Sequence, residues 1–456
     1  MVAKIKSANL MHRQQQGNIQ PSRIVVALMS FLAELEWRGL LHQTAGPHLS
    51  EHLATPGRIG YCGFDPTADS LTVGNFIAIK LLMHWQRAGH TPIALMGGGT
   101  GLIGDPSGKD SERQLLDADQ VRSNIASQRK ALERLLDFDP RCPNAAMLLN
   151  NQDWLGSLGY IEMLRDVGKY FSVNAMLQRD SVRERLQQRE QGISYTEFSY
   201  VLLQAYDFLH LRQTHNCTAQ LAGSDQYGNI VAGMDLIRRK LPEGQNDSYA
   251  VTNKLLVRAD GQKIGKSAGN AVWLNPDRTS PFKFYQFWLN TDDADIIRFL
   301  YWLTFMPREQ IEELAADHAQ APHQRAAHRA LAQHLTDLVH GESARSGAEQ
   351  AASTLFGRND PRTLDEQTLR EVFADIPHSE HRRDQLAAGM DIVDLLTRTP
   401  LAQSRREARE FLSNGAITVN GERITPDCQI TSDDLLHGDT LLLRRGKKHW
   451  HAMLWR

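Results

Sequence analysis

The sequence lacks the features of a disulfide-rich or membrane-spanning protein. It has four cysteines in 456 residues, and they stand far apart at Cys62, Cys142, Cys217 and Cys428. This spacing favours neither a disulfide framework nor a zinc knuckle, and it fits a reducing, cytoplasmic setting. No apolar run reaches the roughly 18 residues that a membrane helix needs, so we expect no membrane span.

An excess of charge of one sign is also missing, because the formal net charge is −2. The molecule as a whole is therefore no basic nucleic-acid binder, and any RNA contact must use a local patch. In the N-terminal extension expected at 1–25, the first ~20 residues carry Lys4, Lys6 and Arg13 but no apolar core of a secretory signal. This leaves a transit peptide or an N-terminal extension, of which we favour the extension. The length allows two or three domains.

The stretch from Gly60 to Asn75 predicts a strand, a loop and the start of a helix. Residues 58–62 suit a buried strand, and the apolar residues 76–85 suit a core helix. Gly63, Pro66 and Gly74 lie between them as turn formers. Free N–H groups at such a helix start bind phosphate, and a glycine there allows close approach of the ligand. We therefore expect a phosphorylated ligand at this loop.

A second glycine-rich loop, 97–109, follows a predicted strand at 91–96. Gly99, Gly101 and Gly104 form a formal G-x-G-x-x-G, which is typical of dinucleotide-binding proteins. The motif should open a helix directly, but Asp105-Pro106-Ser107-Gly108 interrupts it, so we disfavour this interpretation. Lys109 has no glycine six positions before it, which excludes a P-loop. A tight turn without a ligand stays open as an alternative.

Residues 196–208 predict a helix with three polar residues on one face. Tyr200, Gln204 and Asp207 stand at i, i+4 and i+7. They must find partners, either in a buried structural network or in a pocket for a small polar ligand. Asp225 follows a predicted strand that starts at Cys217, where a carboxylate commonly binds ribose hydroxyls.

Further along, residues 255–257 predict a strand, and Asp260-Gly261 predicts a turn. The lysines at 263 and 266 flank Gly265, which by itself indicates a solvated surface loop. Other predicted helices cover 26–42, 119–136, 160–167 and much of 276–356.

The last ~70 residues change in character and predict a small separate module. Residues 404–412 form a predicted helix with two arginines on one face, and Asn420-Gly421 predicts a hairpin turn. The cluster Arg444–Lys448 is basic, but acidic neighbours keep the charge of the module small. A solvated face and a modest RNA-binding surface are both compatible with this pattern.

Taken together, these motifs resemble the bacterial-type tyrosyl-tRNA synthetases, which are class I synthetases with a C-terminal S4 domain. Residues 61–67, Tyr-Cys-Gly-Phe-Asp-Pro-Thr, look like the tyrosine-specific signature. Residues 72–75 occupy the place of the family's His-x-Gly-His motif, with Thr72 for the first histidine and Asn75 for the second. Residues 263–267 match the mobile Lys-Met-Ser-Lys-Ser loop.

The resemblance implies an α/β fold with a Rossmann-like, doubly wound parallel sheet at 26–275. A helical anticodon-side domain at 276–356, a linker at 357–385 and a small α+β S4-like RNA-binding domain at 386–456 would follow. The implied function is activation of L-tyrosine with ATP and transfer of the tyrosyl group to tRNA(Tyr). The resemblance further implies ATP with Mg²⁺ as a substrate complex, no tightly bound cofactor, no metal site and a cytoplasmic homodimer.

The resemblance also implies a role for individual residues. The residues expected to bind tyrosine are Tyr61, Asp105, Asn150, Tyr200, Gln204 and Asp207. Those expected at the ATP and catalytic site are Asp65, Thr67, Thr72, Gly74, Asn75, Gly223, Asp225, Gln226, Lys263, Lys266 and Ser267. Those expected to bind RNA are Arg405, Arg409, Arg444, Arg445, Lys447 and Lys448.

Three alternatives stay open. The absence of both motif histidines suggests a degenerate synthetase that binds RNA without catalysis, although the lysine loop and the polar helix face argue against it. The glycine loop alone would suggest an NAD-dependent oxidoreductase. A tryptophan-specific enzyme of the same class is disfavoured by Tyr61 and Asp207.

Overall fold

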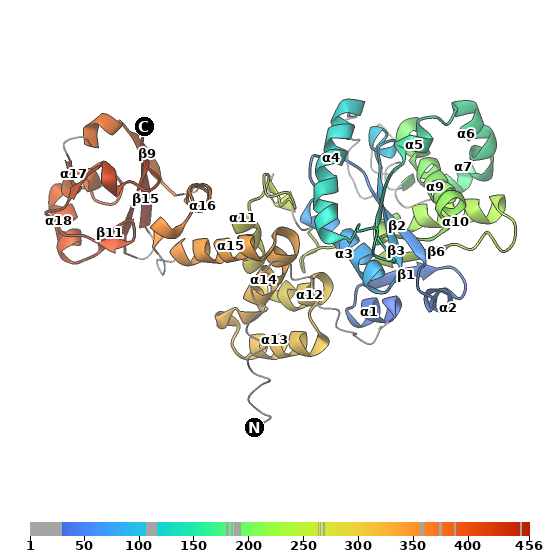
Figure 1. Cartoon of the computed structure of the whole chain (residues 1–456), viewed down its shortest axis with the longest axis horizontal. Coiled ribbons are helices and arrows are strands. Elements are labelled where there is room, and N and C mark those ends of the chain that lie inside the picture. Colours follow the sequence, from blue (N-terminus) through green and yellow to red (C-terminus); the bar gives the residue numbers. More distant parts are fainter. Residues whose placement is uncertain are drawn as a thin grey trace, which may run out of the picture.

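A computed structural model of the chain gives the fold and most side chains. Its described residues are 30–105, 116–178, 182–183, 186, 193–262, 264, 266–267, 270–355, 360–373, 376–386, 389–446 and 449–456. At 266, 267, 270 and 355 the description covers the backbone alone. Figure 1 shows a sheet-containing part in blue and green, a helical part in yellow, and a C-terminal part in orange and red.

A six-stranded sheet forms the first part, with strand order β1-β6-β5-β2-β3-β4. Neighbouring strands from β6 to β4 are parallel, and β1 pairs with β6 antiparallel at the edge. The strands are β1 (Leu41–Ala45), β2 (Ile59–Phe64), β3 (Thr91–Met96), β4 (Met147–Asn150), β5 (Cys217–Gly223) and β6 (Tyr249–Asn253). The chain winds from β2 outward to β4 and then returns to β5 on the other side of β2. This reversal confirms the predicted doubly wound sheet and places its switch point between β2 and β5.

Helices cover both faces of this sheet, as the buried strands require. Tyr61, Ile93 and Leu95 pack in one core cluster with helices α9 and α10, whereas Cys62 and Phe64 belong to the other cluster, with helix α3. The alternation follows the two-residue period of a strand. The main helices are α3 (Val73–Arg87), α4 (Ala118–Leu135), α9 (Tyr195–His215) and α10 (Tyr227–Lys240). Shorter ones are α2 (Leu49–Leu53), α5 (Gln152–Leu155), α6 (Tyr160–Asp166), α7 (Val173–Leu177) and the 3₁₀ turns η1 (Thr100–Leu102), η2 (Gly168–Tyr170) and η3 (Ser224–Gln226).

Two local predictions were wrong. The helix expected over 26–42 is α1 (Phe31–Trp37), because Gly39 follows with φ +67° and the chain then enters β1; residues 26–29 lie outside the described part. The strand predicted at 255–257 is also absent, because Leu255 and Leu256 have no strand assignment and Val257 forms only an isolated bridge. The turn after them is present, since Arg258 N donates to Gln262 O at 2.8 Å and Gly261 has φ +83°.

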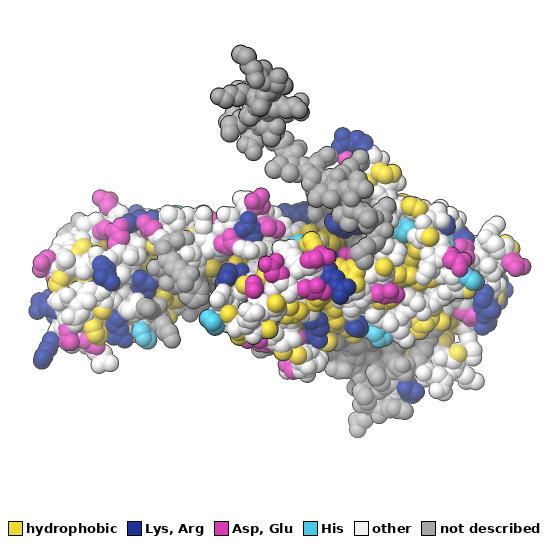
Figure 2. Space-filling model, turned by 90° about the horizontal axis from the view of Figure 1, so that it is seen from below, with side chains coloured by type: hydrophobic (Ala, Val, Ile, Leu, Met, Phe, Trp, Pro, Cys, Tyr) yellow, Lys and Arg dark blue, Asp and Glu magenta, His cyan; other side chains and the backbone are white. Residues whose placement is uncertain are grey.

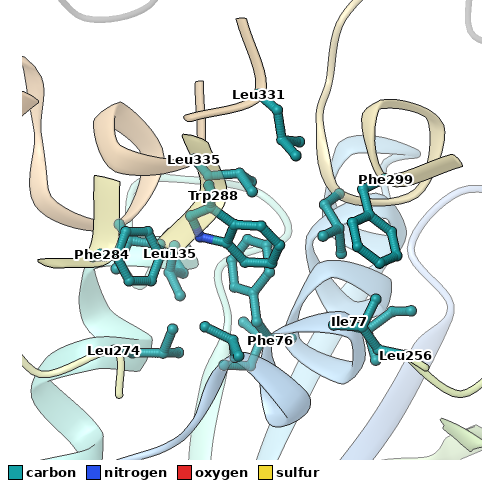
Figure 3. Close-up of a cluster of buried hydrophobic side chains, with 14 of the residues drawn as sticks. Phe76, Ile77, Leu135, Leu256, Leu274, Phe284, Trp288, Phe299, Leu331 and Leu335 are labelled. Carbon is teal, nitrogen blue, oxygen red and sulfur yellow. The ribbon is translucent and has the colours of Figure 1, made fainter. Parts of the chain in front are cut away.

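The helical prediction for 276–356 is confirmed. The helices are α11 (Pro281–Leu289), α12 (Asp293–Leu303), α13 (Arg308–Gln320), α14 (Ala326–His340) and α15 (Glu342–Leu355), with the 3₁₀ turn η4 (Pro322–Gln324). Trp288 of α11 lies between Phe76 of α3 and Leu335 of α14 (Figure 3). One continuous apolar core therefore joins the sheet-containing part to the helical part.

The C-terminal part is a small α+β module. Its five-stranded sheet has the order β12-β11-β14-β15-β9. Asn420 and Gly421 both have positive φ, at 48° and 88°, and join β11 to β12 in the predicted two-residue hairpin. The elements are β9 (His378–His381), β10 (Met390–Asp391), β11 (Ile417–Val419), β12 (Glu422–Arg423), β13 (Gln429–Ile430), β14 (Thr440–Arg445), β15 (His449–Trp455), α17 (Ile392–Thr397), α18 (Arg405–Ser413), η6 (Arg383–Leu386) and η7 (Ser432–Asp434).

The described residues of the segment predicted as a linker, 360–373 and 376–385, are folded. They contain η5 (Pro361–Thr363), α16 (Glu366–Val372) and strand β9, which pairs in parallel with β15. Phe373 packs on Trp450 with ring centroids 5.1 Å apart. The chain thus connects the two parts by packed structure, while the domain boundaries themselves stay a prediction.

In the described part of the chain, no helix combines the length and apolar character needed to cross a membrane.

Candidate active site

A polar cavity of about 270 Å³ lies at the carboxyl ends of β2 and β5, at the switch point of the sheet. The ligands of open α/β sheets bind at this position. Its floor and walls come from β2 with the loop after it, the start of α3, β3 with the loop after it, Asn151, α9, β5 with the turn after it, and Leu255. The lining residues are Tyr61, Cys62, Gly63, Phe64, Asp65, Thr67, Gly74, Asn75, Ile77, Ala78, Leu95, Gly97, Thr100, Asp105, Asn151, Tyr200, Gln204, Asp207, Gln220, Ala222, Gly223, Asp225, Gln226 and Leu255.

One end of the cavity is formed by two buried groups, Tyr61 and Asp207. Asp207 is 2% exposed, and its carboxylate accepts hydrogen bonds from Trp154 Nε1 at 2.7 Å and Asn151 Nδ2 at 2.9 Å. Tyr61 is 1% exposed, and its hydroxyl has no hydrogen-bond partner among the described residues. A buried hydroxyl without a partner is costly in the empty protein and is suited to a ligand that supplies one.

Burial shifts the ionisation of both groups. It raises the pKa of Asp207 to about 7, against the hydrogen bonds from Asn151 and Trp154, which favour the charged form. Burial, together with the charge of Asp207, raises the pKa of Tyr61 well above its ordinary value. At neutral pH this end of the cavity therefore presents a neutral phenol beside a carboxyl group close to its titration midpoint.

A second carboxylate, Asp65, is held in the middle of the cavity. It accepts hydrogen bonds from Thr100 Oγ1 at 2.8 Å and from the Tyr200 hydroxyl at 3.0 Å. Burial, followed by the charges of Asp65 and Asp105, raises the pKa of Tyr200 well above its usual range, so the hydroxyl stays a donor. Asp65 is thus fixed by groups from two elements that are distant in sequence.

A chain of side-chain amides orients a third carboxylate, Asp105. Gln226 Nε2 donates to Asp105 at 2.7 Å, and Asn229 Nδ2 donates to both Gln226 Oε1 and Gln204 Oε1 at 3.1 Å. Because the Asp105 carboxylate can only accept, Gln226 must present its NH₂ group to it, and the direction of each following amide in the chain is then determined. The arrangement places the Asp105 carboxylate and the Gln204 side chain on the same wall.

The glycines after β3 are required by close packing rather than by a dinucleotide. A Cβ at Gly97 would lie 2.2 Å from Asp65 Oδ1, and one at Gly98 would lie 2.1 Å from Asn150 Oδ1. The backbone at these positions must therefore approach polar side chains more closely than any other residue allows. Within the described residues the loop continues into η1 and not into an α-helix, which argues against the dinucleotide interpretation.

The structure places Asn150 outside the cavity lining and its neighbour Asn151 inside it. Asn150 Oδ1 accepts from Gly98 N and Gln152 N, both at 3.1 Å, so this side chain closes the loop instead. Asn151 is 1% exposed, accepts from Gly99 N at 2.8 Å and donates to Asp207. We therefore replace Asn150 by Asn151 as the candidate. Periodicity could not separate two adjacent asparagines at a strand end.

Sequence reasoning also missed Trp154, Thr100 and Gln220. Trp154 and Thr100 act on Asp207 and Asp65 through the hydrogen bonds given above. Gln220 is 2% exposed and lines the cavity, and its Oε1 has no partner among the described residues. The sequence gives one usable signal, a glutamine inside an otherwise apolar strand.

The start of α3 differs in detail from the expectation. Asn75 and Gly74 line the cavity, but Thr72 does not. The Thr72 hydroxyl instead donates to Asn75 Oδ1 at 2.8 Å, and Thr72 N donates to the same oxygen at 3.0 Å. Thr72 is the N-cap of the helix and turns toward Asn75.

The remaining predicted residues of the ATP site fall into two groups. Asp65, Thr67, Gly223, Asp225 and Gln226 line the cavity. Lys263 lies outside the described residues, and of Lys266 and Ser267 the structure describes the backbone, which pairs as β7 (Lys266–Ser267) with β8 (Asn270–Ala271). Their side-chain roles stay predictions.

The predicted RNA-binding arginines lie on the C-terminal module in unequal settings. Arg409 is exposed, and Arg405 is exposed but paired with Asp394 at 2.8 Å. Arg445 donates to Leu401 O at 2.7 Å, and Arg444 stacks on Trp450 at 5.0 Å, so both are half-buried. Lys447 and Lys448 lie outside the described residues. Basic and acidic side chains are interspersed on the face shown in Figure 2.

Among the described residues, Asp293, His318 and His328 are the one group with metal-ligand spacing, and they lie on α12, α13 and α14, away from the cavity. His328 Nε2 lies 3.0 Å from Thr291 O, and its Nδ1 has no hydrogen-bond partner in the part of the chain that the structure describes. A ligating histidine usually donates its other N–H to an acceptor, so this arrangement suits a structural histidine better.

Comparisons with known proteins agree with this geometry. The family described as "tRNA synthetases class I (W and Y)" matches residues 57–357, and the "Tyrosine--tRNA ligase SYY-like C-terminal domain" matches 368–453. Tyrosine--tRNA ligases of Bacillus caldotenax and Rhodopirellula baltica are 46% and 48% identical to the chain. Each covers 93% of this chain, which spans 99% and 96% of their respective lengths.

Among solved structures, the chain resembles a C-terminally truncated Aspergillus nidulans mitochondrial tyrosyl-tRNA synthetase. The TM-score is 0.62 at 30% identity, over 72% of this chain and 94% of that one. The family match, the relatives and the cavity agree, and the chain belongs to the tyrosine and tryptophan group of class I tRNA synthetases, among the tyrosine--tRNA ligases.

Proposed function

We propose that this chain activates L-tyrosine with ATP and transfers the tyrosyl group to tRNA(Tyr). The observation that supports specificity for tyrosine is that Tyr61 and Asp207 both line the buried end of the cavity. A bound phenol can accept from the Tyr61 hydroxyl and donate to the Asp207 carboxylate. An indole ring has one N–H donor and no acceptor, so tryptophan would leave the Tyr61 hydroxyl without a hydrogen-bond acceptor.

The amino-acid end of tyrosine would lie toward Asp105 and Tyr200. An ammonium group needs acceptors, and the Asp105 carboxylate and the Tyr200 oxygen supply them on the wall of the cavity. The tyrosine carboxylate then faces the start of α3. In this position it can attack the α-phosphorus of ATP, with pyrophosphate as the leaving group.

The phosphates of ATP would lie against the start of α3, where Thr67, Gly74 and Asn75 line the cavity. Free N–H groups at a helix start and preorganised donors stabilise the charge of the transition state. Asp225, on the turn after β5, is our candidate for the ribose hydroxyls, with Gly223 beside it. Lys263, Lys266 and Ser267 would close over the pyrophosphate.

The chemistry needs no covalent enzyme intermediate. Burial raises the pKa of Cys62, the thiol that lines the cavity, to about 12, and that of Cys217 to about 12 as well. A thiol with such a pKa is a poor nucleophile at neutral pH. Attack by the substrate carboxylate itself, followed by attack of the tRNA ribose, therefore fits the site better.

Mg²⁺ would enter with ATP. The ion prefers one or two carboxylates together with phosphate oxygens and water, and Asp65 and Asp225 are carboxylates of this cavity. The two residues fit such a complex and form no acidic cage of their own. The ion would neutralise phosphate charge, while the chain orients the reacting groups.

A second copy of this chain is the partner we propose for α6, α7 and the start of α9. Of the large apolar side chains that are exposed in the described residues, all but Val231 lie between 160 and 195. Ile161 is 74% exposed and Val173 is 58% exposed. Exposed apolar side chains that gather on neighbouring elements are typical of a protein interface. We place the dimer in the cytoplasm, in keeping with four unpaired cysteines.

The test is ATP–pyrophosphate exchange measured side by side with tyrosine and tryptophan. We expect exchange with tyrosine and almost none with tryptophan. A chain without exchange that still binds tRNA would be a degenerate, RNA-binding synthetase. Sedimentation of wild type and Ile161→Glu tests the dimer, which the charged residue should dissociate.

A further inference from the structure

The two positions where this chain departs from the family motif, Thr72 and Asn75, are in contact with each other. Thr72 N is a backbone N–H and can only donate, so the Asn75 atom that faces it at 3.0 Å must be the oxygen. The Thr72 hydroxyl donates to the same oxygen at 2.8 Å. The direction of the Asn75 amide therefore follows from chemistry and not from a choice between two similar atoms.

This orientation decides what Asn75 can offer to a ligand. An amide is planar, with its oxygen and its NH₂ group on opposite branches of one carbon. With the oxygen turned back to Thr72, the NH₂ group points away from the N-cap. Asn75 lines the cavity whereas Thr72 does not, so the two N–H donors are the part of this pair that can reach a ligand.

The helix start that carries the pair is itself anchored. Val73 N donates to Val272 O at 3.0 Å, Leu274 N donates to Leu71 O at 2.8 Å, and Thr72 pairs with Trp273 in an isolated bridge. These contacts tie the first turn of α3 to the segment directly after the lysine loop. The Asn75 donors are thus held in a fixed position relative to the backbone of residues 272–274.

We propose that Thr72 is a positioning residue that acts through Asn75. It holds the Asn75 oxygen so that the amide N–H groups donate to an oxygen of bound ATP, and it does not contact the nucleotide itself. This inference rests on the proposed synthetase function and deepens it. The pair would take over one donor role within the motif, with Thr72 supplying orientation and Asn75 supplying the hydrogen bond.

A double-mutant cycle separates this role from a direct contact. Thr72→Val removes the hydroxyl and keeps the β-branched shape, and Asn75→Ala removes the amide. We expect Thr72→Val to lower the rate of adenylate formation roughly tenfold, the size expected for one weakened hydrogen bond to a charged group. The KM for tyrosine should not change. In the Asn75→Ala background the same change should have almost no effect, and Thr72→Ser should restore most of the lost rate.

Equal losses from Thr72→Val in both backgrounds would overturn the inference, because Thr72 would then act independently of Asn75. An unchanged rate in Thr72→Val would overturn it as well. Ser30→Ala removes the N-cap of α1, away from the cavity, and controls for the stability loss of any cap. If Thr72→Val does not fold, Thr72→Ala provides a second protein without the hydroxyl.

The same double-mutant cycle can be measured without turnover, by equilibrium binding of ATP to wild type, Thr72→Val, Asn75→Ala and the double mutant. A wild type that binds ATP but performs no exchange would refute the proposed function, while non-additive ATP binding would still support the role of Thr72. Additive ATP binding in an active enzyme would refute the role of Thr72 and leave the function intact.

Discussion

At the scale of single residues, discrimination of tyrosine from phenylalanine depends on polar groups that are buried away from water. The Tyr61 hydroxyl can be satisfied by a phenol and by no group of phenylalanine. Asp207 is held in place by Asn151 and Trp154, so it cannot turn away when the ligand lacks a donor. The cavity therefore enforces specificity through the cost of unpaired polar groups.

Tyr61→Phe should narrow the ratio of kcat/KM for tyrosine over phenylalanine. Strong rejection of phenylalanine by tyrosyl-tRNA synthetase is an established example of this principle, and its size is not our inference. The change removes one hydrogen-bonding group and keeps the ring that packs on Phe208. Steady-state exchange with both amino acids measures the ratio. A ratio equal to that of the wild type would show that Tyr61 does not read the hydroxyl.

Asp207 should make the stability of the empty protein depend on pH. Its folded pKa of about 7 lies above the unfolded value, so the native state binds more protons between about pH 4 and 7. The wild type therefore loses stability as pH rises through this window. Asp207→Asn has no such group, so its stability relative to wild type should increase from pH 4 to 7 and level off above.

Urea unfolding of both proteins at several pH values measures this difference. Loss of the hydrogen bond from Asn151 or Trp154 changes the stability difference between the two proteins by an amount that does not depend on pH. The test is therefore the sign of the slope of that difference against pH. A difference that does not vary with pH would mean that Asp207 titrates normally.

At the scale of elements, α3 has two functions, which depend on its first turn and on its middle. Its first turn faces the cavity, while its middle packs against the helical part, where Lys80 is 0% exposed and lies over the ring of Phe305. Lys80 Nζ has no hydrogen-bond partner among the described residues. Burial, then repulsion by Arg38 and Arg87, lowers its pKa well below the ordinary value.

Lys80→Met should stabilise the protein by about 1–3 kcal/mol, because an apolar side chain of similar length removes the desolvation cost of a buried amine. Since the folded pKa of Lys80 is lowered, the wild type is less stable at low pH, and the gain should grow as pH falls. Chemical denaturation at pH 6 and 9 measures it. Lys130→Met on the exposed face of α4 is the matched control and should change stability by less than about 0.5 kcal/mol. A destabilised Lys80→Met would indicate an acceptor for Lys80 in the folded protein.

At the scale of the whole molecule, the six-stranded sheet and the C-terminal module are separate in space and joined by the helical part (Figure 1). The module has its own apolar core, which includes Ile392, Leu396, Leu441 and Trp455. Other residues of the module, such as Trp450, belong to the large core that runs through α15 and α16. This continuity supports a fixed placement of the RNA-binding surface relative to the cavity.

A chain that ends at Leu355 should keep adenylate formation near the wild-type rate and lose most tRNA charging. Among the described residues none after Leu255 lines the cavity, and the truncated chain keeps the lysine loop at 263–267. Arg405 and Arg409 lie on the removed module. Ending at 385 would instead leave strand β9 without its partner β15. Pyrophosphate exchange reports adenylate formation, and tRNA charging reports the contribution of the removed module. Both are measured at several salt concentrations, because phosphate contacts weaken with salt. A folded truncation without exchange would contradict it.

The sequence by itself determined which local elements form and which of their faces are polar. The strand, loop and helix around Gly60–Asn75, the stripe of Tyr200, Gln204 and Asp207, and the Asn420-Gly421 hairpin follow from periodicity and turn chemistry. These depend on neighbours a few residues away, and the structure confirms them. The lysine-loop side chains stay predictions.

Only the tertiary structure decided which polar groups meet across elements. Asn151 rather than Asn150 reaches Asp207 because β4 ends at Asn150 and the Gly97–Gly98 loop takes up that side chain. Arg445 donates to Leu401 O, and the supposed linker folds into α16 and β9. Each outcome depends on a partner distant in sequence or on a competition between equally suitable partners, which a local pattern does not encode.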